Sequence, residues 1–245
     1  MSAYEAPLKE ILFAMEEVAG LPEIAKLPGY EEAGAETIAA IFEAAGTFSG
    51  EVLAPINKNG DKGCTFKDGQ VTTPEGYRDA YQRFVADGWN AVAFDPAYGG
   101  QGMPWVVTTA LQEIWNSGSV AFAACPMLTQ AAVEALYHHG TEAQKKKYLP
   151  KLVSGEWTGT MNLTEPQAGT DLGAIRTRAE EDGKGGYLLK GQKIFITHGE
   201  HDFVPNIVHM VLARHPGGPA GHKGLSLFVA PKFLVNDDGS LGGRN

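Results

Sequence analysis

The spacing of apolar residues changes once along this chain, close to Gly155, and this change constrains the fold more than any other feature. Before it, apolar side chains recur every three or four residues, which is the spacing of amphipathic helices. After Trp157 they alternate or form short runs bounded by glycine and proline, as in β-strands. We therefore expect an α+β protein, with a helical N-terminal domain over residues 1–157 and a barrel-like β-domain over residues 158–245.

Capping signals mark several of the expected helices. Thr73-Pro74 predicts a helix start, because a hydroxyl can cap the helix and proline fits its first position. Thr141 and Gln144 form a capping box ahead of another helix. The glycine-rich segment 57–70 predicts a loop or a small ribbon. Helices are expected over residues 6–18, 30–52, 73–88, 104–115, 120–139 and 141–153.

Four segments of the second half have strand character: residues 158–163, 187–197, 207–214 and 224–231. Glycine-rich turns at 183–186 and 216–219 separate them. A sheet of so few strands would leave an open edge, which natural proteins cover or close. We therefore expect the β-domain to be incomplete at Asn245.

Composition argues against several classes of protein. The formal net charge of −9 disfavours general binding to nucleic acid. Cys64 and Cys125 lie far apart and outside any C-x-x-C pattern, so neither a disulfide framework nor a zinc site is predicted. We find neither an apolar run long enough for a membrane span nor a signal sequence, and we expect a cytoplasmic protein.

One stretch, Met161-Asn162-Leu163-Thr164-Glu165-Pro166-Gln167-Ala168-Gly169-Thr170-Asp171, has the features of a binding loop. It begins extended, turns at Pro166 and offers closely spaced main-chain groups around Gly169. Thr170 and Asp171 are placed to cap whatever follows.

A second stretch, Lys193-Ile194-Phe195-Ile196-Thr197-His198-Gly199, predicts a strand. Since strand side chains alternate, Phe195 and Thr197 would share one face. An aromatic ring and a hydroxyl on one side of a sheet suit a flat heterocycle, which packs on the ring and meets the hydroxyl at its polar edge.

Together the two stretches resemble the flavin site of the acyl-CoA dehydrogenases, with the patterns T-E-P-x-A-G-S/T-D and K-x-W/F-I-T-x-G in that order. The resemblance covers the whole chain and implies a helical domain followed by a β-barrel-like domain, with FAD as cofactor. Details around Phe195 and Gly224 are similar to a long subgroup that includes 3-(methylthio)propionyl-CoA dehydrogenases.

The resemblance also implies roles at matching positions. Thr164 would hydrogen-bond the pyrimidine edge of the flavin, Thr170 the pyrophosphate beside Gly169, and Thr197 a position near the flavin N5 atom. Phe195 would pack against the ring where many members have tryptophan. The implied cofactor-binding set is Met161, Leu163, Thr164, Gly169, Thr170, Phe195, Ile196 and Thr197.

The activity implied is α,β-dehydrogenation of an acyl-CoA thioester, with flavin N5 as hydride acceptor and an electron-transferring flavoprotein as partner. In the family a glutamate in a C-terminal helical bundle takes the α-proton, and that bundle also supplies part of the FAD adenine site. The resemblance further implies a homodimer or homotetramer when the protein is complete. Nothing in this sequence independently identifies a glutamate for the proton-abstracting role. We therefore assign no catalytic residue and expect a fragment that is inactive alone.

Other interpretations stay open at this stage. A related fold that binds nucleic acid or protein, and an acyl-CoA oxidase that passes electrons to oxygen, are the alternative functions. His198, Glu200, His201 and Asp202 resemble a metal cluster, but a solvated loop is favoured, and no metal is predicted. Cys125 is expected to be a small buried side chain, and the lysines at 145–147 a solvated helix face.

Overall fold

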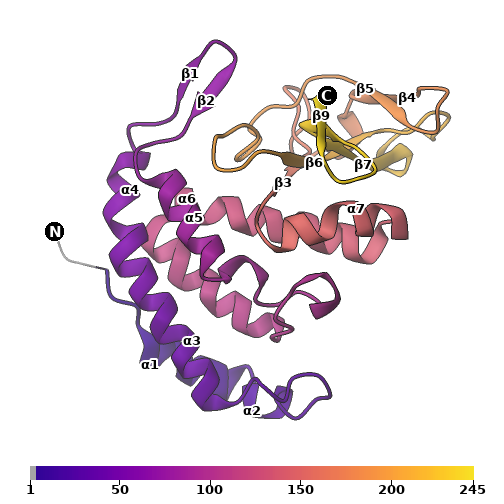
Figure 1. Cartoon of the computed structure of the whole chain (residues 1–245). Coiled ribbons are helices and arrows are strands. Elements are labelled where there is room, and N and C mark those ends of the chain that lie inside the picture. Colours follow the sequence, from indigo (N-terminus) through magenta and orange to yellow (C-terminus); the bar gives the residue numbers. More distant parts are fainter. Residues whose placement is uncertain (1–3) are drawn as a thin grey trace.

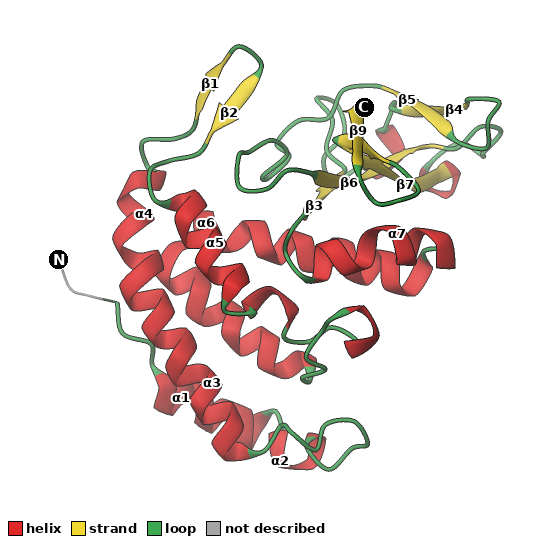
Figure 2. Ribbon diagram, in the orientation of Figure 1, coloured by secondary structure: helices red, strands yellow, loops and turns green. Residues whose placement is uncertain are grey.

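The computed structural model describes residues 4–245 and consists of a helical part followed by strands, with one hairpin between helices (Figures 1 and 2). The last helix ends at Val153, and the first strand of the main sheet begins at Thr158. The α+β fold class is confirmed.

The helices match most of the expected segments but join differently. The run predicted to end at Val52 continues past Pro55, because proline lies in the first turn of the next helical segment, where a missing N–H is tolerated. The helices are α1 (Leu8–Phe13), α2 (Leu21–Ile24), α3 (Ala35–Phe48), α4 (Ala54–Gly60), α5 (Tyr77–Ala86), α6 (Trp105–His139) and α7 (Glu142–Val153), and π-helical turns follow α1 and α3.

Helix α6 is two helices joined at Ser119, whose φ of −158° and ψ of 99° are not helical. The prediction of two helices here is confirmed. The neighbouring Gly118 lies so close to Ser49 that an added Cβ would stand 2.2 Å from the Ser49 Oγ. That hydroxyl donates to the Ile114 carbonyl at 2.8 Å. Close packing against the end of α3 therefore accompanies the break.

The helix start predicted at Thr73-Pro74 is wrong by three residues. Helix α5 begins at Tyr77 after Gly76, which has a φ of 86°. The Thr73 hydroxyl instead donates to Asp202 at 2.5 Å, a contact across 129 residues that no local pattern reveals. The capping box of α7 is confirmed, since Thr141 and Gln144 bond each other's backbone N–H.

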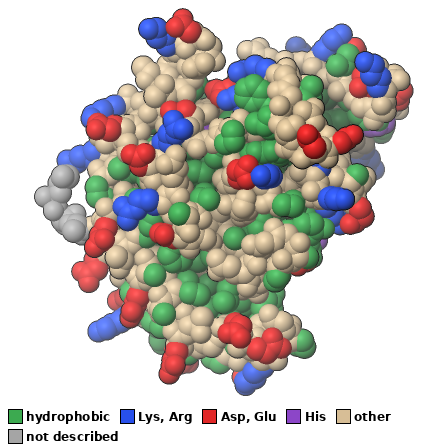
Figure 3. All heavy atoms as spheres, viewed as in Figure 1, with side chains coloured by type: hydrophobic (Ala, Val, Ile, Leu, Met, Phe, Trp, Pro, Cys, Tyr) green, Lys and Arg blue, Asp and Glu red, His purple; other side chains and the backbone are tan. Residues whose placement is uncertain are grey.

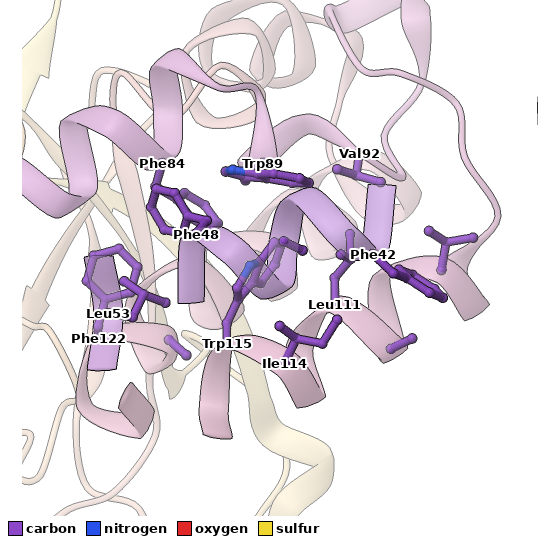
Figure 4. Close-up of a cluster of buried hydrophobic side chains, with 14 of the residues drawn as sticks. Phe42, Phe48, Leu53, Phe84, Trp89, Val92, Leu111, Ile114, Trp115 and Phe122 are labelled. Atoms are coloured by element: carbon purple, nitrogen blue, oxygen red, sulfur yellow. The ribbon is translucent and has the colours of Figure 1, made fainter. Parts of the chain in front are cut away.

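The helical core is aromatic (Figure 4). Phe84 packs edge-on against Trp115 with ring centroids 4.8 Å apart, and Trp89 meets Trp115 at 5.9 Å. Two helical segments, Ala35–Gly60 and Trp105–His139, are long and apolar enough to resemble membrane spans, contrary to the sequence expectation. Since Phe42 and Trp115 of these segments are fully buried, core packing accounts for much of their apolarity.

Strand β6 is the centre of the main sheet. It pairs in parallel with β3 on one edge, meets β4 further along, and pairs antiparallel with β7 on the other edge. Strand β5 pairs with β4, and two hairpins lie outside this sheet. The strands are β1 (Thr65–Lys67), β2 (Gln70–Thr72), β3 (Thr158–Asn162), β4 (Arg178–Glu181), β5 (Tyr187–Lys190), β6 (Ile207–Arg214), β7 (Leu225–Pro231), β8 (Phe233–Val235) and β9 (Leu241–Arg244).

The sheet packs on the helices through β3 and the second half of α6. An added Cβ at Gly159 would stand 2.5 Å from the Ala132 Cβ, so only glycine allows this approach. The Gly159 N–H donates to the Thr129 hydroxyl at 3.1 Å. Trp157 and Met210 join a second core with Leu136. This contact fixes β3, and the loop that follows it, relative to the helices.

Candidate functional site

The two motif stretches lie side by side, as their resemblance to a single site predicts. The Ile194 N–H donates to the Thr164 carbonyl at 3.0 Å. The Lys193 ammonium donates to the Leu163 carbonyl at 2.8 Å. Segments that lie about thirty residues apart in the sequence are therefore tied together by both backbone and side-chain contacts.

The centre of this junction is Glu165, which is 3% exposed. Its carboxylate accepts from the backbone N–H groups of Arg176 at 2.7 Å and Thr177 at 3.0 Å. It also accepts from the Lys193 ammonium at 2.9 Å and the Gln167 amide at 2.6 Å. A buried carboxylate needs several donors to stay charged, and here four are supplied.

These donors outweigh the effect of burial. Burial alone would raise the pKa of Glu165, but the hydrogen bonds from Thr177, Arg176 and Lys193 lower that pKa to about 2. Glu165 is therefore a charged structural anchor at neutral pH and a poor general base. Sequence reasoning read Thr-Glu-Pro as part of a motif and missed this anchor. The signal available was the acid Glu165 in one motif and the basic Lys193 in the other, which have opposite charges.

The loop after Glu165 is a tight hairpin that returns at Ala168, with two backbone hydrogen bonds between these residues. Asp171 then accepts from the Gly173 N–H at 2.9 Å, which confirms the expected capping. Arg214, at the end of β6, donates to the carbonyls of Ile175 and Gly173. The loop is thus held at both ends and leaves Gly169 exposed between them.

The prediction of a strand over residues 193–199 is wrong. Strand β5 ends at Lys190, and the following Gly191 packs tightly on Thr177. Phe195 and His198 have φ of 56° and 50°, a left-handed conformation that strand alternation cannot include. Phe195 consequently points to solvent and is 88% exposed, instead of lying in a flat row with Thr197.

The predicted site residues share one property: each is exposed or half-buried, and none lies in the core. Met161 packs partly against the second core, while Phe195 is the most exposed large apolar side chain among the described residues. Such an open aromatic side chain suits contact with another molecule. The half-buried members are Met161, Leu163, Thr164 and Ile196, and the exposed members are Gly169, Thr170, Phe195 and Thr197.

The segment after Thr197 turns back to the helices. The His198 Nε2 lies 2.9 Å from the Ala121 carbonyl of α6, and since a carbonyl only accepts, the imidazole is the donor. His201 is only 2% exposed, so the interpretation of this segment as a solvated loop is wrong there. Its Nδ1 accepts from the Phe203 N–H at 3.2 Å, and its Nε2 therefore donates to the Thr158 hydroxyl at 3.0 Å.

Cys125 is fully buried, as expected, and it completes a trio with His198 and His201 that the sequence did not reveal. One ligand atom from each residue lies within 4.8 Å of the others. However, both ring nitrogens of His201 already have partners, so a cation here would displace a hydrogen bond. Burial, with His198 and Lys232 nearby, lowers the pKa of His201 to about 3, which keeps it neutral.

Two family models match this chain. The acyl-CoA dehydrogenase N-terminal domain matches residues 35–156, and the acyl-CoA dehydrogenase middle domain matches residues 160–240. The chain belongs to the acyl-CoA dehydrogenase family. Both models meet at the junction of α7 and β3, and the middle-domain match includes both motif stretches.

Curated relatives of this acyl-CoA dehydrogenase chain match over nearly its whole length. The 3-methylmercaptopropionyl-CoA dehydrogenase of Ruegeria pomeroyi is 46% identical over 99% of this chain and 41% of the relative. A butyryl-CoA dehydrogenase of Syntrophomonas wolfei is 36% identical over 99% of this chain and 40% of the relative. The chain therefore spans about two fifths of the length of these relatives.

A solved structure has the same fold. The butyryl-CoA dehydrogenase of Megasphaera elsdenii superimposes with a TM-score of 0.64 at 26% identity, over 79% of this chain and 48% of that chain. The arrangement of helices followed by a curled sheet is therefore that of the acyl-CoA dehydrogenases.

Proposed function

We propose that this chain is the N-terminal and middle portion of an FAD-dependent acyl-CoA dehydrogenase that oxidises an acyl-CoA thioester between its α and β carbons. The observation that carries the proposal is the Glu165–Lys193 pair, which joins the two motif stretches and places Ile194 on the Thr164 carbonyl. Without this junction, Thr164 and the Phe195–Thr197 segment would have no fixed relation to each other.

The residues present fit a flavin. Phe195 offers an exposed aromatic face, and half-buried Leu163 and Thr164 lie beside its segment. Thr164 and Thr197 offer hydroxyls for the polar edge of the ring, while Thr170 and the backbone near Gly169 suit a phosphate. FAD, when bound, would supply the two-electron acceptor for the oxidation.

The proton-abstracting base is proposed to lie outside this chain. A general base must reach the α-carbon, and Glu165, the buried carboxylate of the motif, is held by four donors at a pKa of about 2. The relatives extend well beyond the matched region, which leaves room for a base there. This chain's role is then to bind and orient the cofactor and to form one wall of the substrate site.

The experiment that tests this function is a flavin titration in two forms of the protein. A complete protein, extended to the length of the relatives, should purify yellow and bleach without oxygen when acyl-CoA is added. The 245-residue chain should bind FAD weakly and should not bleach. A complete protein that stays colourless after reconstitution with FAD, or a short chain that turns over substrate, would contradict the proposal.

The substrate and the electron acceptor need separate measurements. The relatives named above act on a thioether-containing and a straight-chain acyl-CoA, as their names state. Comparing 3-(methylthio)propionyl-CoA with pentanoyl-CoA, which replaces the sulfur by a methylene, tests whether sulfur is recognised. We propose an electron-transferring flavoprotein as acceptor. Stoichiometric peroxide without a protein acceptor would instead identify an acyl-CoA oxidase.

On the face shown in Figure 3, the described residues present acidic and basic side chains interspersed, without a continuous basic stripe. Together with the formal net charge of −9, this favours the flavoenzyme over the nucleic-acid-binding alternative. Salt-dependent binding of DNA would be the observation that restores that alternative.

A further inference from the structure

A pocket of about 500 Å³ lies among the helices and includes no residue of the two motif stretches. Four separate parts of the chain line it: the loop before α3, the loop before α6, both ends of α6, and α7. Its volume is in the range of small-molecule sites. The residues that matter to its chemistry are Tyr30, Phe94, Tyr98, Trp105 and Tyr137, with Asp95 and Glu134 between them.

The aromatic side chains form two edge-to-face pairs. Phe94 and Trp105 have centroids 5.9 Å apart and ring planes 74° apart. Tyr98 and Tyr137 are 6.1 Å and 90° apart. Rings held at steep angles turn their faces in different directions, so a ligand between the pairs can meet more than one π-face.

The charged groups at this pocket carry negative charge. The Tyr137 hydroxyl donates to the Asp95 carboxylate at 2.9 Å, which fixes that carboxylate beside the rings. Glu134 lies 3.2 Å from the His138 imidazole. Among the described residues that line the pocket, none is lysine or arginine. Two carboxylates therefore lie at the pocket. The Lys145 ammonium stands 5.8 Å from the Tyr137 ring centroid, but it pairs with Glu142 at 3.0 Å and does not line the pocket.

We propose that this pocket binds a small organic cation with a quaternary ammonium head. Such a group is attracted to aromatic faces by their quadrupoles, and nearby carboxylates add a favourable electrostatic interaction. Its desolvation costs little, because methyl groups cover its surface. A neutral ligand of the same shape would gain only the apolar contact. An anion such as a CoA phosphate would meet two like charges.

The test uses choline and its uncharged isostere 3,3-dimethylbutan-1-ol as a matched pair, titrated into the 245-residue chain by calorimetry. Saturable binding of choline, at least about tenfold tighter than binding of the alcohol, is expected for a cation site. Equal binding of the two would show a merely apolar pocket and overturn the proposal. The absence of saturable choline binding would overturn it as well.

Two variants locate the site. Trp105→Leu removes an aromatic face, and Glu134→Gln removes a charge while keeping the shape; each should weaken choline binding about tenfold or more. Tyr187→Leu, at an exposed aromatic side chain of β5, is the control and should leave binding unchanged. Circular dichroism checks that each variant is folded. Choline affinity that is unaffected in both folded pocket variants would place binding elsewhere and contradict the assignment. None of these readouts involves flavin.

Discussion

Lys193 and Glu165 form an ion pair of 2.9 Å in which the two side chains are 9% and 2% exposed. It joins one motif stretch to the other through two charged groups that are buried. Burying such a pair contributes little net stability, but removing one partner leaves the other charge uncompensated. Loss of either side chain should therefore weaken the contact that holds the two stretches in position.

Lys193→Met should lower the free energy of unfolding by about 3 kcal/mol, because the Glu165 carboxylate then keeps its burial and loses its counter-charge. Urea unfolding at pH 7 measures this. The double variant Lys193→Met with Glu165→Gln should recover part of the loss, since no buried charge remains.

The matched control is Lys190→Met. Lys190 pairs with Glu180 at a similar distance of 2.9 Å, but on the surface, where the two side chains are 57% and 41% exposed. Solvent screens this pair, so the urea midpoint of the Lys190→Met variant should equal that of the wild type. Equal losses in the two lysine variants would show that burial of the Glu165 pair is not what matters.

The stability of the chain should fall as pH drops below about 6.5, before ordinary carboxylates titrate. Burial lowers the pKa of His201 to about 3, whereas in the unfolded chain an imidazole titrates near 6.5. Between these values the unfolded chain binds the extra proton, so acid favours unfolding, by about 1.4 kcal/mol per pH unit for His201 alone. Burial also lowers the pKa of His209 to about 4, which adds a contribution of the same sign. The pKa of Glu165 is lowered from its ordinary value of 4.5 to about 2, so protonation of this carboxylate adds a further loss of folding stability below about pH 4.5.

Urea unfolding at pH 7, 6 and 5 measures this slope. His201→Gln should make it shallower by about 1.4 kcal/mol per pH unit, whatever its effect on absolute stability, because one of the buried imidazoles is gone. His209, whose pKa burial lowers to about 4, still contributes to the remaining slope. His222→Gln, at an exposed position of a surface turn, should leave the slope as it was. A slope that is the same in wild type and His201→Gln would contradict the assignment.

Much of the fold could be predicted because its signals are local. The bounds of β6 coincide with the predicted 207–214, since the apolar run there is buried in the sheet. The capping box at Thr141 and the two helices on either side of Ser119 also follow from neighbouring residues. Each of these features leaves a signal within a few positions of the chain, although β6 and the break at Ser119 are completed by distant contacts.

The errors arise where distant contacts override local preference. Thr73 has the chemistry of a helix cap, but its hydroxyl is bound by Asp202. Residues 193–199 have the composition of a strand, but Lys193 is drawn to Glu165, and the chain turns at Phe195 with a φ of 56°. The burial of His201 and Glu165 likewise depends on partners that no spacing rule identifies. The structure thus brings the two predicted stretches together with a backbone that the sequence did not predict, and the roles of the site residues stay predictions.

Gly159→Ala should destabilise the chain by about 1–3 kcal/mol, because the new Cβ would stand 2.5 Å from the Ala132 Cβ where β3 packs on α6. The companion change Ala132→Gly should restore much of this loss by vacating the contacted atom. Gly243→Ala is the control, since its added Cβ meets nothing within 4 Å. Thermal unfolding of these variants measures the effect, and failure of the double variant to recover would mean that the strand does not approach the helix this closely.

Thr197→Val tests the proposed flavin contact in a complete protein. Thr197 is exposed, so valine should leave the unfolding midpoint unchanged, whereas loss of one hydrogen bond to the flavin should slow bleaching by acyl-CoA about tenfold. Anaerobic stopped-flow absorbance measures the rate. Thr65→Val, at an exposed position of the β1–β2 hairpin, is the matched control and should bleach at the wild-type rate. If Thr197→Val also bleaches at that rate, the hydroxyl makes no contact that matters to the reaction, and the assignment of Thr197 to the flavin site is wrong.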